Sequence, residues 1–362
     1  MQHGEKKSQA ARPARATVGP VQIGPLELPQ NLVLAPMAGV TNLPFRLIAV
    51  ESGAGLVFTE TVSAKGLVSG GPKSWRLVES SPEEQPLAYQ IFGGEADFIE
   101  RASALLVERG AQWIDLNLGC PVKKFLKHGA GACLLREPER VGPLVRGMRR
   151  ANPRGVVSVK VRLGWDSSSI TAPEVARIAE AEGADLVSVH GRTRAQLYSG
   201  HADRSGIRDV VEAVSVPVLA NGDITSAEEA LSMLNDTGAA GVMIGRAAQG
   251  QLWLPGAIAD ALARNKPDIR APAPAKQLAF QHRHSAALHD FYGDYLGPRI
   301  ARKHHAWFLE SLREQSVLTS DVAKELRRAF NTLATPRAQL DQLETYVRFI
   351  AEPAIAARAP DK

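Results

Sequence analysis

Eight short segments between residues 32 and 245 are apolar at nearly every position. A strand with one solvent-facing side alternates apolar and polar residues, whereas a short continuous apolar run is typical of a parallel sheet covered on both faces. The runs are LVLAP (32–36), LVFTE (56–60), LAYQI (87–91), WIDLN (113–117), VVSVKV (156–161), LVSVH (186–190), VPVLAN (216–221) and GVMIG (241–245). The pattern therefore predicts eight buried strands.

Segments with helical spacing separate most of these strands. Three examples are EADFIERASALLVERG (95–110), PEVARIAEAEG (173–183) and SAEEALSMLNDTG (226–238). A Gly-Ala pair repeatedly stands between a helical segment and the next strand, and glycine ends a helix in the left-handed conformation without a Cβ penalty. These pairs are Gly53-Ala54, Gly110-Ala111, Gly183-Ala184 and Gly238-Ala239. Eight such units in about 250 residues predict a (β/α)₈ TIM barrel.

An open, doubly wound sheet is the alternative fold. It would carry a G-x-G-x-x-G turn after its first strand, where a dinucleotide binds. This chain has MAGVTN (37–42) at that position. The first loop therefore favours the barrel.

The pattern changes after residue 265. NKPDIRAPAPAK (265–276) holds three prolines, which is typical of a linker, and helical spacing dominates beyond it. Pro298 and Pro336 stand where a first helical turn would begin, and Ser320 can cap a helix. The expected helices cover 276–291, 298–313, 319–331 and 336–351. We thus expect an α/β chain made of a basic tail (1–20), a TIM barrel (21–265), a linker (266–275) and a small all-helical domain (276–351).

The composition agrees with a water-soluble globular protein. Apolar residues make up 44% and charged residues 22%, and no apolar run approaches the roughly 18 residues of a membrane span. Two cysteines cannot form a disulfide framework, and the N-terminus lacks the apolar core of a secretory signal. We expect a reducing, cytoplasmic location. The net charge of +5 permits a polyanionic partner without establishing one.

Polar residues gather where the predicted strands end. In TIM-barrel enzymes the active site lies at the C-terminal ends of the strands, so these residues should converge on one mouth. They are Pro36-Met37-Ala38, Gln90, Asn117, Gly119-Cys120-Pro121, Lys160, Arg162, His190, Arg192, Asn221-Gly222-Asp223 and Gly245-Arg246. No set of Cys and His has the spacing of a zinc site, so we expect no metal.

The last two strand ends suggest a phosphate site. The loops after strands seven and eight commonly bind phosphate in such barrels. Here they read NGD (221–223) and GRA (245–247), in which glycine backbone lets an anion approach and Arg246 adds charge. The alternative is that both glycines only form turns.

Lys160 and Arg162 are two positions apart on one strand and so share a face. Two cations on the inner face of a barrel are costly unless an anion meets them. A flavin phosphate, an anionic flavin ring or an RNA phosphate would serve. A salt bridge to Asp185 or Asp223 is the competing interpretation.

Cys120 follows the fourth strand, between Gly119 and Pro121. A buried, inert cysteine is the ordinary explanation of such a residue. At the functional rim, however, a thiol with a pKa of about 8.5 is protonated at neutral pH and can act as a general acid. Cys133 is instead expected to pack at the start of a helical stretch.

Several motifs together carry a family resemblance. They are APMAGVTNLPFR (35–46), YQIFGG (89–94), DLNLGCPVKK (115–124), KVRLGW (160–165), VHGRTR (189–194), ANGDI (220–224), MIGRAAQG (243–250), HDFYG (289–293) and RIARKHHAWFL (299–309). With them, the chain resembles the bacterial tRNA-dihydrouridine synthases over about residues 21–350. The similarity is to the B-type branch, which includes proteins named for nitrogen regulation.

The resemblance implies a role for each strand-end residue. Cys120 resembles the family's proton donor, and Asn117 and Arg162 resemble contacts to uridine or tRNA. The implied FMN-binding set is Pro36, Met37, Ala38, Gln90, Lys160, His190, Asn221, Gly222, Asp223, Gly245 and Arg246. The helical domain resembles the family's tRNA-binding domain. Further basic residues either form a solvated rim or contact RNA phosphates: Lys123, Lys124, Arg192, Arg194, Arg299, Arg302 and Lys303.

The resemblance also implies the reaction. Reduced FMN would give a hydride to C6 of uridines in the tRNA D-loop, Cys120 would give a proton to C5, and Lys160 would stabilise the anionic reduced flavin. NADPH or NADH would reduce the flavin transiently, and we expect a monomer with no membrane partner. Two alternatives remain: an FMN barrel dehydrogenase of a small cyclic substrate, and a flavin-binding regulatory protein without turnover. The helical tail argues against the first, and the intact Cys120 against the second.

Overall fold

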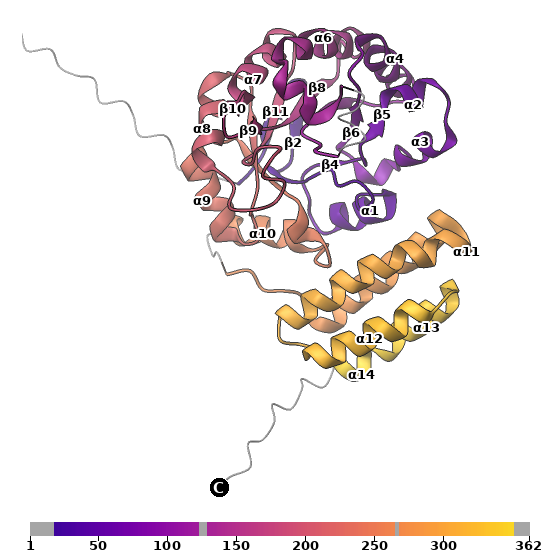
Figure 1. The fold of residues 1–362 in the computed structure, drawn as a ribbon. Coiled ribbons are helices and arrows are strands. Elements are labelled where there is room, and N and C mark those ends of the chain that lie inside the picture. The colour runs from indigo at the N-terminus through magenta and orange to yellow at the C-terminus, as the bar shows by residue number, and fades with distance from the viewer. Residues whose placement is uncertain (1–17, 123–128, 265–267, 351–362) are drawn as a thin grey trace, which may run out of the picture.

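The structure, a computed structural model, describes residues 18–122, 129–264 and 268–350. Its main body is a ring of parallel strands surrounded by helices (Figure 1). All eight predicted strands are present: β3 (Leu32–Leu34), β4 (Val57–Phe58), β6 (Leu87–Phe92), β7 (Trp113–Leu118), β8 (Val156–Arg162), β11 (Leu186–His190), β12 (Val218–Asn221) and β13 (Gly241–Ile244). The predicted TIM barrel is confirmed.

The order of the strands closes the ring. They run β3-β13-β12-β11-β8-β7-β6-β4, and the neighbours are parallel. Backbone hydrogen bonds then join the two ends, from Leu34 N–H to the Leu56 carbonyl and from Gly55 N–H to the Leu32 carbonyl, both at 2.9 Å. A sheet without open edges directs the C-terminal ends of all the strands to one mouth.

Helices cover the outside of the ring. They are α1 (Leu43–Glu51), α4 (Ala96–Val107), α6 (Val141–Ala151), α7 (Ala172–Ala181), α8 (Arg204–Ala213), α9 (Ala227–Thr237) and α10 (Leu254–Ala263). The unit after β4 instead carries β5 (Val62–Ser63), α2 (Ala64–Val68) and α3 (Pro72–Leu77). The predicted glycine joints hold, because the four glycines, at 53, 110, 183 and 238, all have positive φ, from 71° to 101°.

Two short antiparallel hairpins complete the barrel. The pair β1 (Val21–Ile23) and β2 (Leu26–Leu28) precedes β3, and its Ile23 and Leu28 are buried in the same cluster as the inward residues of the strands. The pair β9 (Gly164–Asp166) and β10 (Ser169–Ile170) follows β8. The first hairpin therefore adds apolar side chains to the interior cluster.

Four helices follow the barrel: α11 (Pro274–Glu314), α12 (Ser320–Thr332), α13 (Pro336–Thr345) and α14 (Val347–Ile350). We call residues 274–350 the helical module. The predicted break between 291 and 298 falls at Gly293, whose φ of 73° and ψ of 175° interrupt α11, and Pro298 lies inside the continuing helix. Thr319, not Ser320, caps α12, because its hydroxyl accepts from Val322 N–H. Across the described ranges, no helix has the length and apolar character needed to cross a membrane.

The helical module packs beside α1 and α10 (Figure 1). Histidines of α11 form part of this contact: the ring of Phe45 on α1 lies 5.7 Å from that of His284 and 5.8 Å from that of His304. Both histidines are buried, and burial lowers the pKa of His284 to about 3. The aromatic and basic cluster at 301–308 therefore joins the two parts of the molecule in addition to any role toward RNA.

Candidate functional site

A pocket of about 560 Å³ opens at the C-terminal ends of the strands. All eleven predicted flavin-binding residues line it, together with Asn117, Cys120 and Arg162. The parallel register explains the convergence, because it places Asn117 beside Lys160 and His190 beside Asn221 on adjacent strands. Residues far apart in the chain thus reach one level of the barrel.

Lys160 points into this pocket from β8 and forms no ion pair with any residue that the structure describes. Its Nζ donates to Asn221 Oδ1 at 3.1 Å, while Asn221 Nδ2 donates to the Met243 carbonyl at 2.7 Å and so fixes the amide. Burial, with the nearby charge of Arg162, lowers the pKa of Lys160 to about 8. The competing salt bridge is wrong, since Asp185 pairs with Arg149 instead.

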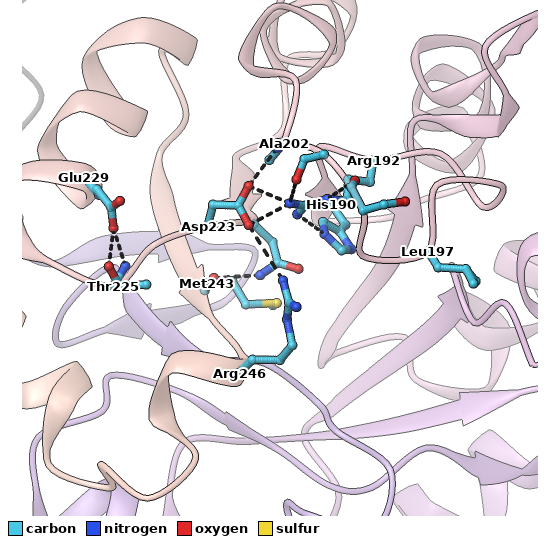
Figure 2. Close-up of polar contacts among 12 residues, drawn as sticks. His190, Arg192, Leu197, Ala202, Asp223, Thr225, Glu229, Met243 and Arg246 are labelled. Atoms are coloured by element: carbon cyan, nitrogen blue, oxygen red, sulfur yellow. Dashed lines mark hydrogen bonds and ion pairs between the residues drawn. The ribbon is translucent and has the colours of Figure 1, made fainter. Parts of the chain in front are cut away.

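Asp223 is held by two arginines at the edge of the proposed phosphate loops (Figure 2). Arg192 Nη2 donates to both of its carboxylate oxygens at 2.8 and 2.7 Å, and Arg246 Nη2 lies 3.7 Å from Oδ1. Asp223 Oδ2 also accepts from Ala202 N–H at 2.8 Å. Burial raises the pKa of Asp223, but these donors outweigh it and hold the pKa below its usual value. Asp223 therefore stays ionised and is paired with arginines instead of Lys160.

Gly222 makes room in the same loop. Its φ is +133°, and a Cβ atom there would lie 2.6 Å from the Ala202 Cβ, so a side chain is excluded by conformation and by space. Asp223 follows with φ of 52°, a conformation that Asp tolerates better than most residues. The conformation of Gly222 and its packing against Ala202 therefore require glycine here, and the phosphate site in this loop stays a prediction.

His190 faces the pocket as a neutral imidazole. Burial and the charges of Lys160 and Arg162 lower its pKa to about 2. Its Nε2 lies 3.4 Å from Arg192 Nη1, and because a guanidinium can only donate, Nε2 accepts. The ring proton therefore resides on Nδ1, which can donate to a ligand oxygen or nitrogen.

Cys120 lies in a half-buried loop that Asn117 holds in place. Asn117 Oδ1 accepts from Gly119 N–H at 3.1 Å and from Cys120 N–H at 2.9 Å. Burial raises the pKa of the Cys120 thiol, although Val122 N–H and Arg162 partly oppose this. The thiol is accordingly protonated at neutral pH and able to donate, as the sequence analysis expects.

Arg162 supports the same loop from β8. Its Nε donates to the Gly119 carbonyl at 3.0 Å, and its Nη1 donates to the carbonyls of Thr193 at 3.0 Å and Leu197 at 2.7 Å. Its Cζ also lies 5.5 Å from the centre of the Tyr198 ring. Arg162 therefore ties the Cys120 loop to the loop after β11 at the edge of the pocket.

Tyr198 is a site residue that the sequence analysis missed. It is 53% exposed, lines the pocket, and has the Arg246 Cζ 4.4 Å from its ring centre. Leu197 beside it has a φ of 53°, which is unusual for a leucine. The Cζ atoms of Arg162 and Arg246 both lie within 5.5 Å of the centre of this exposed ring, so it makes cation–π contacts at the edge of the pocket. Tyr198 lies eight residues beyond the end of β11, so a search limited to the strand ends does not include it.

Two predicted tRNA contacts need correction. Arg192 is 2% exposed, and Asp223 and the carbonyls of Ser199 and Gly200 occupy its guanidinium, so an RNA phosphate cannot reach it. Lys303 turns inward, where its Nζ donates to the Gly39 carbonyl. The N–H of the same Gly39 donates to Glu60. Lys303 therefore joins the helical module to the loop that carries Met37.

The other predicted tRNA contacts stay predictions. Arg299 is exposed and stacks over Tyr295, with 3.7 Å from Cζ to the ring centre, and Arg194 lies over Trp165 at 4.5 Å. Arg302 is half-buried and donates to the Leu333 carbonyl at 3.0 Å. Lys123 and Lys124 lie outside the described residues.

The residues present fit a flavin. Thr61 lines the pocket with a buried hydroxyl that has no hydrogen-bond partner among the described residues, so a bound molecule can satisfy it. Lys160 provides a cation that pairs with no carboxylate of the described residues, and His190 provides a single donor. A planar, anionic, hydrogen-bonding molecule matches this combination.

Comparison with known proteins agrees with the geometry. The family model for dihydrouridine synthase matches residues 33–351. A tRNA-dihydrouridine synthase B of Pseudomonas putida is 42% identical over 328 residues, which cover 90% of this chain and 94% of that protein. A tRNA-dihydrouridine synthase B of Vibrio cholerae is 39% identical, covering 91% of this chain and 100% of its own length.

Among solved structures, the likeness is one of fold. Histamine dehydrogenase from Rhizobium sp. 4-9 superposes with a TM-score of 0.52 at 14% identity, covering 73% of this chain and 50% of that one. An amine oxidase of Pseudomonas geniculata gives a TM-score of 0.52 at 16% identity, with 72% and 52% covered.

Proposed function

The chain belongs to the dihydrouridine synthase family, and from this premise we propose that it reduces the C5=C6 bond of D-loop uridines in tRNA, with FMN as cofactor and NADPH or NADH as reductant. One observation supports the proposal most: the protonated thiol of Cys120 lines the same pocket as the ammonium of Lys160, which forms no ion pair within the described part of the chain. Such a reduction needs a proton donor for the substrate and a cation for the cofactor.

We assign each group of the flavin to a part of the pocket. The loops of Gly222-Asp223 and Gly245-Arg246 would hold the phosphate with backbone N–H groups and the exposed Arg246 guanidinium. Lys160 and the Nδ1 proton of His190 would face the polar edge of the ring. When bound and reduced, the flavin supplies a hydride.

Cys120 supplies the other half of the reduction. In uracil, the C5=C6 bond is conjugated with the C4 carbonyl, so a hydride at C6 leaves an enolate that must take a proton at C5. The thiol gives this proton and becomes a thiolate. Arg162, which holds the Gly119 carbonyl, lies close enough to stabilise the thiolate charge, and solvent returns the proton.

The substrate base must leave its stack to enter the pocket. The exposed ring of Tyr198 offers a stacking surface at the entrance, and Arg246 and Arg162 flank it with positive charge. Arg299 on the helical module is exposed and can contact a phosphate of the same RNA.

The test uses the full chain with FMN, NADPH and unmodified tRNA. We expect dihydrouridine to form, and Cys120→Ala to retain FMN and NADPH oxidation while dihydrouridine formation falls at least about a hundredfold, the usual contribution of a general acid. Cys133→Ala is the matched control and should behave as the unaltered protein. Unchanged dihydrouridine formation in Cys120→Ala would exclude the thiol as the proton donor.

A further inference from the structure

A buried carboxylate lies one layer below the floor of the pocket. Asp115 points inward from β7 and is fully buried, as are Gln90 on β6 and Ser158 on β8. The parallel register aligns these three residues side by side across three strands. None of the roles derived above for Cys120, Lys160 or His190 makes use of this carboxylate.

Asp115 begins a chain of hydrogen bonds that ends at the Cys120 loop. Gln90 Nε2 donates to Asp115 Oδ2 at 2.7 Å, and Asn117 Nδ2 donates to Gln90 Oε1 at 2.8 Å. Asn117 Oδ1 then accepts from Gly119 N–H at 3.1 Å and from Cys120 N–H at 2.9 Å. The other carboxylate oxygen, Oδ1, accepts from the Ser158 hydroxyl at 2.5 Å.

The direction of each bond in the chain follows from the carboxylate. An ionised carboxylate can only accept, so Gln90 must turn its NH₂ group toward Asp115 and its oxygen toward Asn117. Asn117 must then present its NH₂ to that oxygen, which leaves its own oxygen facing the two loop N–H groups. If Gln90 were reversed, Asn117 would reverse too, and its NH₂ would oppose the N–H groups of Gly119 and Cys120.

We propose that Asp115 is a positioning residue for the proposed reaction: through Gln90 and Asn117, it sets the amide orientations that hold the Cys120 loop in its productive conformation. The inference rests on the proposed function, since it assigns the thiol of this loop as the proton donor. Asp115 itself is not among the residues that line the pocket, so it would act through Gln90 and Asn117.

The test variant is Asp115→Asn, which preserves shape but adds a donor. It lets Gln90 reverse, so we expect kcat for dihydrouridine formation to fall by about tenfold or more, while flavin reduction by NADPH stays within about twofold. Because Gln90 also lines the pocket, both rates are measured at saturating FMN. Ser158→Ala is the matched control. It removes the Ser158 hydrogen bond to Asp115 and the acceptor of Trp113 Nε1, but it adds no donor next to Gln90, so kcat should stay within about threefold.

A double variant distinguishes an effect of the amide orientations from an effect of altered packing around residue 115. When Asp115→Asn is combined with Gln90→Glu, the new carboxylate accepts from the amide introduced at position 115 and from Asn117, which restores the orientation of Asn117. We expect this double variant to recover at least about a third of the lost kcat on a logarithmic scale. It also tests the idea if Asp115→Asn alone does not fold. A folded, flavin-bound double variant without recovery contradicts the proposal.

A second readout does not depend on tRNA. The alkylation rate of Cys120 by iodoacetamide, followed on its own peptide, should rise about threefold or more in Asp115→Asn and not in Ser158→Ala. If the unaltered protein makes no dihydrouridine, the proposed function fails, while this measurement still decides the chain of hydrogen bonds. Equal alkylation rates and equal kcat in Asp115→Asn and the unaltered protein would overturn the positioning role.

Discussion

Flavin binding should be accompanied by proton uptake by the protein in alkaline solution. Burial and the charge of Arg162 lower the pKa of Lys160 to about 8. An anion close to Nζ favours the ammonium and should return the pKa to its ordinary value near 10.5. The difference predicts the uptake: about 0.1 proton per flavin at pH 7, about 0.5 at pH 8 and about 0.9 at pH 9.

Other groups near the pocket contribute little to this uptake. His190, with a pKa of about 2, is neutral throughout this range, and Asp115, with a pKa of about 6, is already ionised at pH 8. Because the bound state has the higher pKa, the affinity for flavin should also fall above pH 8, by about fivefold from pH 8 to 9 and about sevenfold from pH 9 to 10. The signal therefore reports on Lys160.

Titration calorimetry of FMN binding in two buffers of different ionisation enthalpy measures the proton uptake directly. The observed heats should differ between buffers at pH 8 and pH 9 and nearly coincide at pH 7. Lys160→Met should remove the difference and weaken binding. Heats that agree between buffers at pH 9 for the unaltered protein would refute the assignment of Lys160 as the group that meets the bound anion.

Three further predictions concern the frame of the site. Lys303→Met removes the donor to a pocket loop and should weaken flavin binding about fivefold in a fluorescence titration; unaltered affinity would separate the helical module from the pocket. Glu84→Gln leaves the fully buried Arg46 without its counterion and should cost about 3 kcal/mol in the free energy of unfolding, measured by denaturant titration; a loss under about 1 kcal/mol would contradict this. The pKa values of His284 and His304 are lowered in the folded state, so below about pH 6.5 the unfolded state binds protons that the folded state does not. The Tm should therefore fall as the pH drops from 7 toward 5. His284→Phe should make that decline shallower, and an equal slope would exclude His284 as a source.

The barrel could be predicted because its signal is local and repeated. Each strand is an apolar run, and each joint needs a glycine with positive φ, as at Gly238. In a TIM barrel the C-terminal ends of all strands meet at one mouth, so the convergence of the strand-end residues could be predicted without knowing their contacts. Lys160 and Cys120 accordingly line one pocket.

Side-chain direction beyond the strand ends could not be predicted in the same way. Lys303 and Arg192 appear as basic rim residues in the sequence, but Gly39 and Asp223, far away in the chain, determine where they point. The histidines of 301–308 likewise pack inward because α11 lies against α1. Such pairings depend on the docking of helices and on the conformation of loops after neighbouring strands, and neither produces a periodic pattern in the sequence.

Asp115 illustrates a signal that was present in the sequence and unused. It stands two positions before Asn117, so strand periodicity places both on the inner face of the barrel. A carboxylate on an inner face must have hydrogen-bond donors nearby. Taking every second residue backward from Asn117 would have identified Asp115 as an inward-facing residue. It would not have identified its partners, Gln90 on β6 and Ser158 on β8.

The central claim is that this chain makes dihydrouridine in tRNA. The most direct test is mass-spectrometric mapping of dihydrouridine in tRNA from cells with and without the gene. We predict that specific D-loop positions lose the modification without the gene and regain it with the unaltered chain, but not with Cys120→Ala. Identical dihydrouridine at every position in both cell lines would contradict this function.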